Sequence, residues 1–160
     1  MSVQLHGFSD ASEHAYAGVV YIRMVDSVGG VHTSLVMSKT KVAPIKRLTI
    51  PRLELCGAHL LAQILHHCKE VFSLPLKDVF AWTDSTIVLN WLVGSPRRFK
   101  TYVGNRISSI MQLISPDCWS HVNGLDNPAD CASRGLFPSE LLNFALWWDG
   151  PKWLRLSPDE

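Results

Sequence analysis

Long hydrophobic runs are missing from this sequence. No stretch of 18 or more apolar residues occurs among its 160 residues, so we expect no transmembrane helix. The opening residues, MSVQLHGFSD, have neither the charged start nor the apolar centre of a signal peptide or anchor. The four cysteines form no C-x-x-C pair, and His66 and His67 beside Cys68 lack a second half-site, which disfavours zinc. We therefore expect reduced, mostly buried cysteines in an intracellular protein.

A strong excess of either charge is also missing, because the formal net charge is only +1. Overall charge thus gives no signal for nucleic acid, and only local clusters of basic residues could do so. The composition of 47% apolar and 18% charged residues is that of a globular chain and excludes a disordered one. A length of 160 residues fits one domain that buries most of its apolar surface.

Hydrophobic periodicity predicts three strands, a helix, a strand, two helices, a strand and a helix, in that order. The predicted strands cover residues 3–10, 15–25, 31–42, 76–83 and 118–122. The predicted helices cover a long segment from residue 53, with Pro51 in its first turn, and residues 85–93, 100–114 and 128–134.

This order of elements predicts an α/β fold. Short turns join the first three strands, which should be antiparallel, whereas helical crossovers should make the later two strands parallel to the first. The expected architecture is a five-stranded mixed sheet flanked by helices. Residues 137–160 are rich in Trp and Pro. We expect them to form an extension that packs on a domain of residues 1–136, or on a neighbour.

Four acidic residues stand at the ends of predicted elements: Asp10, Glu54, Asp84 and Asp130. Carboxylates at the ends of neighbouring elements can converge, and four of them would repel strongly unless cations lay between them. Such a cluster is what a two-metal phosphodiester hydrolase needs. Taken singly, Asp84 could be a turn or capping residue, and Asp130 could compensate a helix dipole.

Five phrases carry a family resemblance: FSDAS, SKTKVAPIKRLTIPRLEL, WTDSTIVLNWL, NPADCASRG and WWDGPKWL. In this order they resemble the RNase H-like domain of BEL/Pao-type LTR retrotransposon polyproteins, within the ribonuclease H superfamily. The resemblance implies the RNase H fold, cleavage of the RNA strand of RNA/DNA hybrids, and two Mg²⁺ (or Mn²⁺) ions. It also implies that Asp10, Glu54, Asp84 and Asp130 are the metal-binding catalytic carboxylates.

The same analogy suggests how the four carboxylates divide their work. Asp10 would bridge both ions, because the first strand is central in this fold. Glu54 and Asp84 would serve the ion at the leaving group, and Asp130 the ion at the nucleophilic water.

Three further residues are candidates near the site. His121 precedes Asp130 by nine residues, and relatives often carry a mobile histidine upstream of the last Asp. His121 is therefore a candidate catalytic residue, although a structural place inside a strand is equally open. Ser85 and Asn127 could contact nucleic acid, but Asn127 could merely start a helix.

Basic residues form two clusters that flank the acidic residues in sequence. Because phosphate contacts on either side of a scissile bond need such groups, both clusters are expected to bind nucleic acid, the alternative being a solvated face. The first cluster is Lys39, Lys41, Lys46, Arg47 and Arg52, and the second is Arg97, Arg98, Lys100 and Arg106.

The function predicted from these features is an endoribonuclease that acts during reverse transcription of a retroelement. The chain looks excised from a polyprotein, so the expected partners are RNA/DNA hybrid and neighbouring reverse transcriptase and integrase domains, with no membrane. We expect it in the cytoplasm, within retroelement particles. The alternatives are a non-catalytic RNase H-like module that binds nucleic acid or a polyprotein domain, and a DNA-directed nuclease of the same superfamily.

Overall fold

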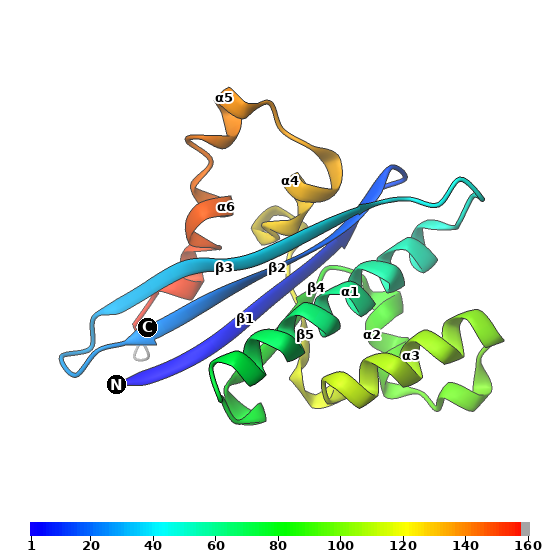
Figure 1. The fold of residues 1–160 in the computed structure, drawn as a ribbon, viewed down its shortest axis with the longest axis horizontal. Coiled ribbons are helices and arrows are strands. Elements are labelled where there is room, and N and C mark those ends of the chain that lie inside the picture. Colours follow the sequence, from blue (N-terminus) through cyan, green and yellow to red (C-terminus); the bar gives the residue numbers. More distant parts are fainter. Residues whose placement is uncertain (158–160) are drawn as a thin grey trace.

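A five-stranded mixed sheet organises residues 1–157, the part of the chain that the computed structural model describes (Figure 1). Its strands are β1 (Ser2–Ala11), β2 (Ala15–Val25), β3 (Val31–Val42), β4 (Val79–Thr83) and β5 (Trp119–His121), in the spatial order β3-β2-β1-β4-β5. The β1–β2 and β2–β3 pairs are antiparallel, and the β1–β4 and β4–β5 pairs are parallel. The predicted α/β architecture is confirmed.

Helices cover both faces of this sheet. They are α1 (Ile50–Val71), α2 (Thr86–Val93), α3 (Thr101–Leu113), α4 (Ala129–Arg134), α5 (Pro138–Leu141) and α6 (Ala145–Asp149). Helices α1, α2 and α3 lie on one face, and α4 and α6 lie on the other (Figure 1). Each face has its own apolar core: Leu5 and Leu61 belong to the first, and Phe8 and Leu154 to the second. Alternation along β1 thus supplies side chains to both cores.

The long helix α1 lies close against β1 and β2, because glycines line the contact. A Cβ atom on Gly57 would come within 3.0 Å of the Asp10 carbonyl oxygen, and one on Gly18 within 3.1 Å of Leu61 Cα. Since these neighbours are backbone atoms, a larger side chain could fit only if the helix moved. The glycine at position 57 therefore fixes the distance between α1 and the end of β1.

Most boundaries of the predicted elements agree with the structure to within one residue, and two differ by three residues. The predicted strand 76–83 begins later, because Leu76–Asp78 forms a 3₁₀ turn closed by a hydrogen bond from Asp78 N to Pro75 O at 3.0 Å. Helix α1 begins at Ile50, before the predicted residue 53, and Pro51 lies in its first turn as predicted. A proline without an N–H is tolerated there because that N–H has no partner within the helix.

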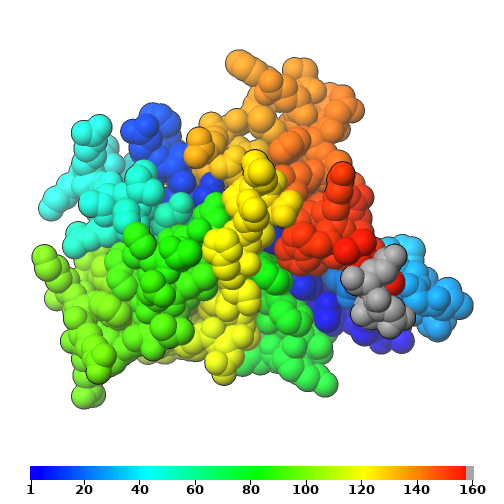
Figure 2. Space-filling model, turned by 180° about the vertical axis from the view of Figure 1, so that it is seen from behind, coloured from blue at the N-terminus to red at the C-terminus, as the bar shows by residue number. Residues whose placement is uncertain are grey.

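Residues 137–157 contact the sheet on the α4 side. The Tyr21 hydroxyl donates to Trp147 O at 2.6 Å, and Arg23 Nε donates to Leu154 O at 2.8 Å. The Trp153 ring lies 4.8 Å from the Trp82 ring. Figure 2 shows this red segment beside the yellow segment around β5. A domain boundary at residues 136/137 remains our proposal, and residues 158–160 of the proposed extension lie outside the described residues.

Two predicted absences bear on the class of protein. No helix in residues 1–157 is long and apolar enough to cross a membrane. The four cysteines are free; Cys56, Cys68 and Cys131 are buried, and Cys118 is half-buried.

Candidate active site

Three carboxylates from three elements converge at one end of the sheet. Asp10 is the penultimate residue of β1, and Asp84 directly follows β4, next to the paired residues Ser9 and Thr83. Because β1 and β4 are parallel neighbours, their carboxyl ends reach the same edge of the sheet. Glu54 reaches that edge from the first turns of α1. One carboxylate oxygen from each of the three residues lies within 4.8 Å of the others.

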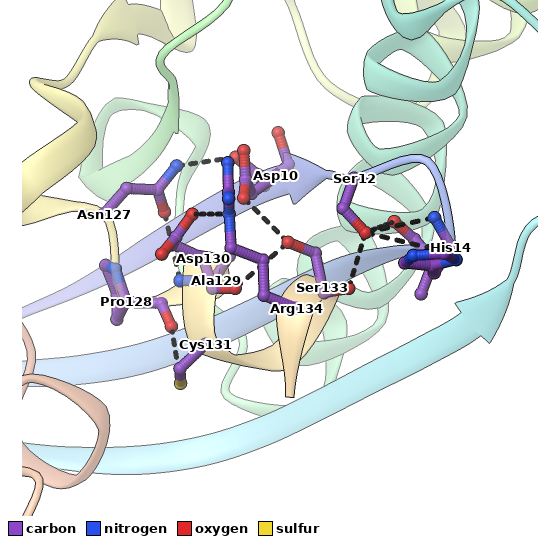
Figure 3. Close-up of polar contacts among 12 residues, drawn as sticks. Asp10, Ser12, His14, Asn127, Pro128, Ala129, Asp130, Cys131, Ser133 and Arg134 are labelled. Atoms are coloured by element: carbon purple, nitrogen blue, oxygen red, sulfur yellow. Dashed lines mark hydrogen bonds and ion pairs between the residues drawn. The ribbon is translucent and has the colours of Figure 1, made fainter. Parts of the chain in front are cut away.

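Asp130 lines the same hollow but is not part of this close group. The hollow has a volume of about 730 Å³, and all four acidic residues contribute to its wall. Asp130 is half-exposed on α4, where its Oδ1 accepts a hydrogen bond from Arg134 Nε at 2.9 Å (Figure 3). The four predicted carboxylates thus face one hollow, three of them in mutual contact range and the fourth paired with a cation.

Two serine contacts dock α4 onto the end of β1. Ser133 Oγ donates to Asp10 Oδ2 at 2.8 Å, and Ser12 Oγ donates to Ser133 O at 2.7 Å (Figure 3). On the other side of α4, Asn127 Nδ2 donates to Ser9 O at 2.9 Å. Buried hydrogen bonds of this kind leave a donor or acceptor unpaired if either partner is removed, so they hold α4 in one position.

Burial and mutual repulsion raise the pKa values of the three close carboxyl groups. Burial raises the pKa of Glu54 to about 9, helped by the charges of Asp10 and Asp84. Burial also raises the pKa of Asp10 to about 7, with Asp84 adding to the effect and the Ser133 hydrogen bond opposing it. The pKa of Asp84 is raised by burial and the charge of Asp130, against the Asn127 hydrogen bond. Without a compensating cation, the group therefore favours protonated carboxyls.

The buried side chain of Glu54 has an unsatisfied oxygen. Glu54 is 8% exposed and Asp10 is 4% exposed. Glu54 Oε2 is one of three buried side-chain polar atoms in residues 1–157 that have no hydrogen-bond partner. A buried carboxylate oxygen without a hydrogen-bond donor is energetically costly. Its position beside two other carboxylates therefore indicates a place for a cation that these oxygens could coordinate.

The chain is similar in sequence to one protein family. The family model for the Pao retrotransposon-like RNaseH-like domain matches residues 1–85, which is more than half of the chain. The chain belongs to this family. The match includes Asp10, Glu54 and Asp84, whereas Asp130 lies in the part of this Pao RNaseH-like domain beyond the matched segment.

Two solved structures with a TM-score of 0.50 show the same fold at low sequence identity. Two structures of LC11-RNase H1, isolated from compost by a metagenomic approach, each have 13% identity and a TM-score of 0.50. The one in complex with RNA/DNA hybrid covers 81% of this chain and 91% of that chain, and the other covers 81% and 90%. RNase H1 of the halophilic archaeon Halobacterium salinarum NRC-1 has 16% identity, coverage of 79% and 89%, and a TM-score of 0.45. No curated protein matches the chain.

The other predicted site residues of this Pao RNaseH-like domain have distinct surroundings. His121 is exposed at the end of β5, opposite Thr83, and its charge opposes the raised pKa of Asp84. Asn127 is fully buried; besides its bond to β1, its Oδ1 accepts from Ala129 N at 3.1 Å. Ser85 Oγ accepts from Val88 N at 3.3 Å and caps α2. Asn127 and Ser85 therefore have structural contacts, whatever else they bind.

The two basic clusters meet beside the α1 N-terminus. Arg52 from the first cluster and Arg98 and Lys100 from the second line a hollow of about 580 Å³, together with the aromatic rings of Trp91 and Phe99. The remaining basic residues Lys39, Lys41, Lys46, Arg47 and Arg97 are exposed, and Arg106 is half-buried. Because these basic side chains reach the surface, they are able to contact phosphates.

The Tyr102 ring connects the clusters as well. The Arg52 guanidinium lies 4.9 Å and the Arg106 guanidinium 3.7 Å from its centroid. Stacking on an aromatic ring orients a guanidinium without neutralising its charge.

Three residues near the site escaped the sequence interpretation: Ser12, Ser133 and Arg134. Ser133 and Arg134 follow Asp130 by three and four residues on α4, which is the spacing that brings helical side chains to one face. That spacing could have predicted that Ser133 and Arg134 lie near Asp130. Ser12 gave none, because its contact with Ser133 spans 121 residues.

Proposed function

We propose that this Pao RNaseH-like domain is a metal-dependent endoribonuclease that cleaves the RNA strand of RNA/DNA hybrids during reverse transcription of a retroelement. The observation that carries the proposal is the convergence of Asp10, Glu54 and Asp84 around the unpartnered Glu54 Oε2. A purely structural role would have given the buried Glu54 Oε2 a donor or a counter-charge, as is usual for buried carboxylates in proteins.

The donor set fits divalent cations of the hard type. All members of the close group offer carboxylate oxygens, and neither a thiolate nor an imidazole belongs to it. Such a set suits Mg²⁺ or Mn²⁺ better than zinc. We propose that Asp10, Glu54, Asp84 and Asp130 hold two such ions. When bound, these would activate water and neutralise charge on the phosphodiester in the transition state.

The protein's own groups have further proposed roles. Ser133 holds Asp10 in its orientation through the 2.8 Å hydrogen bond, and Asn127 keeps α4 on β1. His121 is our candidate for carrying a proton to or from the reacting groups, since it is exposed and close enough to Asp84 to affect its pKa. Burial of the close carboxylates excludes bulk water from them on one side.

The hybrid would lie across both hollows. The acidic hollow would take the scissile phosphodiester, and the basic hollow with Trp91 and Phe99 would take the phosphates and sugars of the second strand. Lys39, Lys41, Lys46, Arg47, Arg97 and Arg106, together with Ser85 and Asn127, complete the proposed contacts. LC11-RNase H1, which shares the fold, has been solved with RNA/DNA hybrid.

The family match also suggests partner domains and a cellular location. We propose neighbouring reverse transcriptase and integrase domains of the same polyprotein as partners, and retroelement particles in the cytoplasm as the place of action.

A cleavage assay tests the proposal. A hybrid labelled on either strand is incubated with the protein in Mg²⁺, Mn²⁺, Ca²⁺ or chelator. We expect cleavage of the RNA strand alone, only in Mg²⁺ or Mn²⁺, because Ca²⁺ takes more ligands at longer distances. Turnover in chelator would contradict the metal mechanism, and equal cutting of duplex DNA would point to a DNA nuclease. Binding of hybrid without any cleavage would favour a non-catalytic module.

A further inference from the structure

Arg134 is the one basic residue of the Lys/Arg type that lines the acidic hollow within residues 1–157. Five acidic residues share this wall, namely Asp10, Glu13, Glu54, Asp84 and Asp130. A single guanidinium among these carboxylates would repel a cation that enters the hollow and attract an anion.

The backbone of Arg134 is fixed, but its side chain is not. Helix α4 ends at Arg134 and is followed by Gly135, whose φ is 88°, and the neighbouring Ser133 is tied to both Asp10 and Ser12. The Arg134 side chain, in contrast, is 68% exposed, and Asp130 is 46% exposed. Among the described residues only Nε has a bonded partner, at 2.9 Å from Asp130 Oδ1.

An exposed pair of this kind is weak and easily exchanged. Water screens both charges, and each side chain must give up conformational freedom to keep the contact. The pair also involves the one proposed metal ligand that lies outside the close group. A cation arriving at Asp130 would displace the guanidinium, which would then face the hollow with its donors free.

We infer that Arg134 exchanges partners during the reaction cycle: it neutralises Asp130 in the free protein, yields Asp130 to a divalent cation, and then binds a phosphate of the RNA strand. This inference rests on the proposed function, because it takes the hollow as the site of cation and phosphodiester binding. Arg134 is thereby a substrate-contacting residue, and also a competitor of the cation at Asp130. The planar guanidinium suits phosphate, which it can contact through two N–H groups.

The two roles predict opposite effects of Arg134→Ala: tighter binding of the cation and weaker binding of the hybrid. Without the competing guanidinium, Mg²⁺ or Mn²⁺ should bind the free protein about two- to fivefold more tightly in calorimetry. The same variant should bind a labelled RNA/DNA hybrid more weakly in Ca²⁺ buffer. The slope of log affinity against log salt should be shallower by about 0.9, as for one lost phosphate contact. Arg134→Lys should lie between the parent and the Ala variant in both measurements.

The matched control is Arg155→Ala. Arg155 also faces an aspartate, Asp149, at 3.8 Å, the two side chains are 40% and 46% exposed, and neither lines the acidic hollow. This variant should bind ion and hybrid as the parent does. If Arg134→Ala weakens ion binding, Arg134 merely positions Asp130; if it leaves hybrid binding at the level of the control, the phosphate contact is absent. Either result overturns the inference. A parent protein that binds neither ion nor hybrid would instead refute the proposed function.

Discussion

The close carboxylates and Asp130 are held in different ways. Strand register and the α1 contact at Gly57 fix Asp10, Glu54 and Asp84, which are buried or half-buried and have no cationic partner in residues 1–157. Asp130 lies on a six-residue helix, is half-exposed, and has Arg134 beside it. One part of the site is therefore buried, with carboxylates that repel one another, whereas the other part is half-exposed and already paired with a cation. The variants below compare these two parts.

The largest effect is expected from Asp84→Asn. A neutral amide cannot replace a carboxylate as ligand in the close group, so hybrid cleavage should fall by at least about 10³-fold. Asp130→Asn should cost less, about 10- to 100-fold, because water can reach the half-exposed position and take the place of one ligand. Cleavage rates at saturating hybrid and Mg²⁺ measure both. Equal losses would mean that the two parts of the site are not functionally distinct.

The second basic cluster should contribute to binding and little to chemistry. Replacing Arg97, Arg98 and Lys100 with Ala should raise the apparent KM for hybrid and flatten its salt dependence by up to about three phosphate contacts. The rate at saturation should persist, because these contacts are the same in ground and transition states. Steady-state kinetics over a salt titration measures this effect. If the variant keeps the parent's KM at every salt concentration, the second cluster is only a solvated face.

Gly57→Val tests the contact that holds the buried part together. A Cβ atom at position 57 would lie 3.0 Å from the Asp10 carbonyl oxygen, so the added side chain should push α1 away and carry Glu54 with it. We expect unfolding free energy to fall by about 1–3 kcal/mol and cleavage to fall further than stability explains. Denaturant titration and the cleavage assay measure the two effects. Gln63→Ala, an exposed change on the same helix, is the control and should alter neither.

The smallest effect concerns pH in the metal-free protein. The folded pKa values of Asp10 and Glu54 are raised to about 7 and about 9, while unfolded carboxyls titrate near 4. The folded state therefore binds more protons between these values, and stability should be full below about pH 4 and fall as pH rises towards 9. Thermal unfolding in chelator measures this fall in stability.

Two comparisons sharpen the pH prediction. Glu54→Gln should flatten the fall because it removes a buried carboxyl group and its repulsion of the others, and Mg²⁺ should abolish it because a cation compensates the buried charges. Stability that rises with pH in chelator would contradict the electrostatic account of the buried group.

The sequence predicted the regular parts of this molecule well, for physical reasons. The β-branched and apolar residues of 15–25, and the turn DSVGG before 31–42, predicted β2 and β3 to the residue. The positions of Asp10 and Asp84 at strand ends predicted their convergence, because parallel neighbours end at one edge. The roles of the predicted site residues remain proposals.

What the sequence could not predict was set by contacts between distant residues. Nothing local to Asp130 indicated that it would lie outside the close group, because that depends on how α4 docks through Ser133 and Asn127. Ser85 and Asn127 were predicted to contact nucleic acid, although each satisfies a backbone group nearby. The pairing of Arg134 was visible in the spacing of α4 but its place in the hollow was not.

The serine contacts between β1 and α4 also determine how much of the chain must be synthesised before the site can form. They join residues separated by 121 and 123 positions, so the end of β1 can meet α4 only after the segment that contains β4 and β5 has been made. A ribosome-bound chain that has emerged only as far as Asp84 carries three of the acidic residues but lacks α4. Competence for hybrid would thus appear only once α4 has folded onto the end of β1.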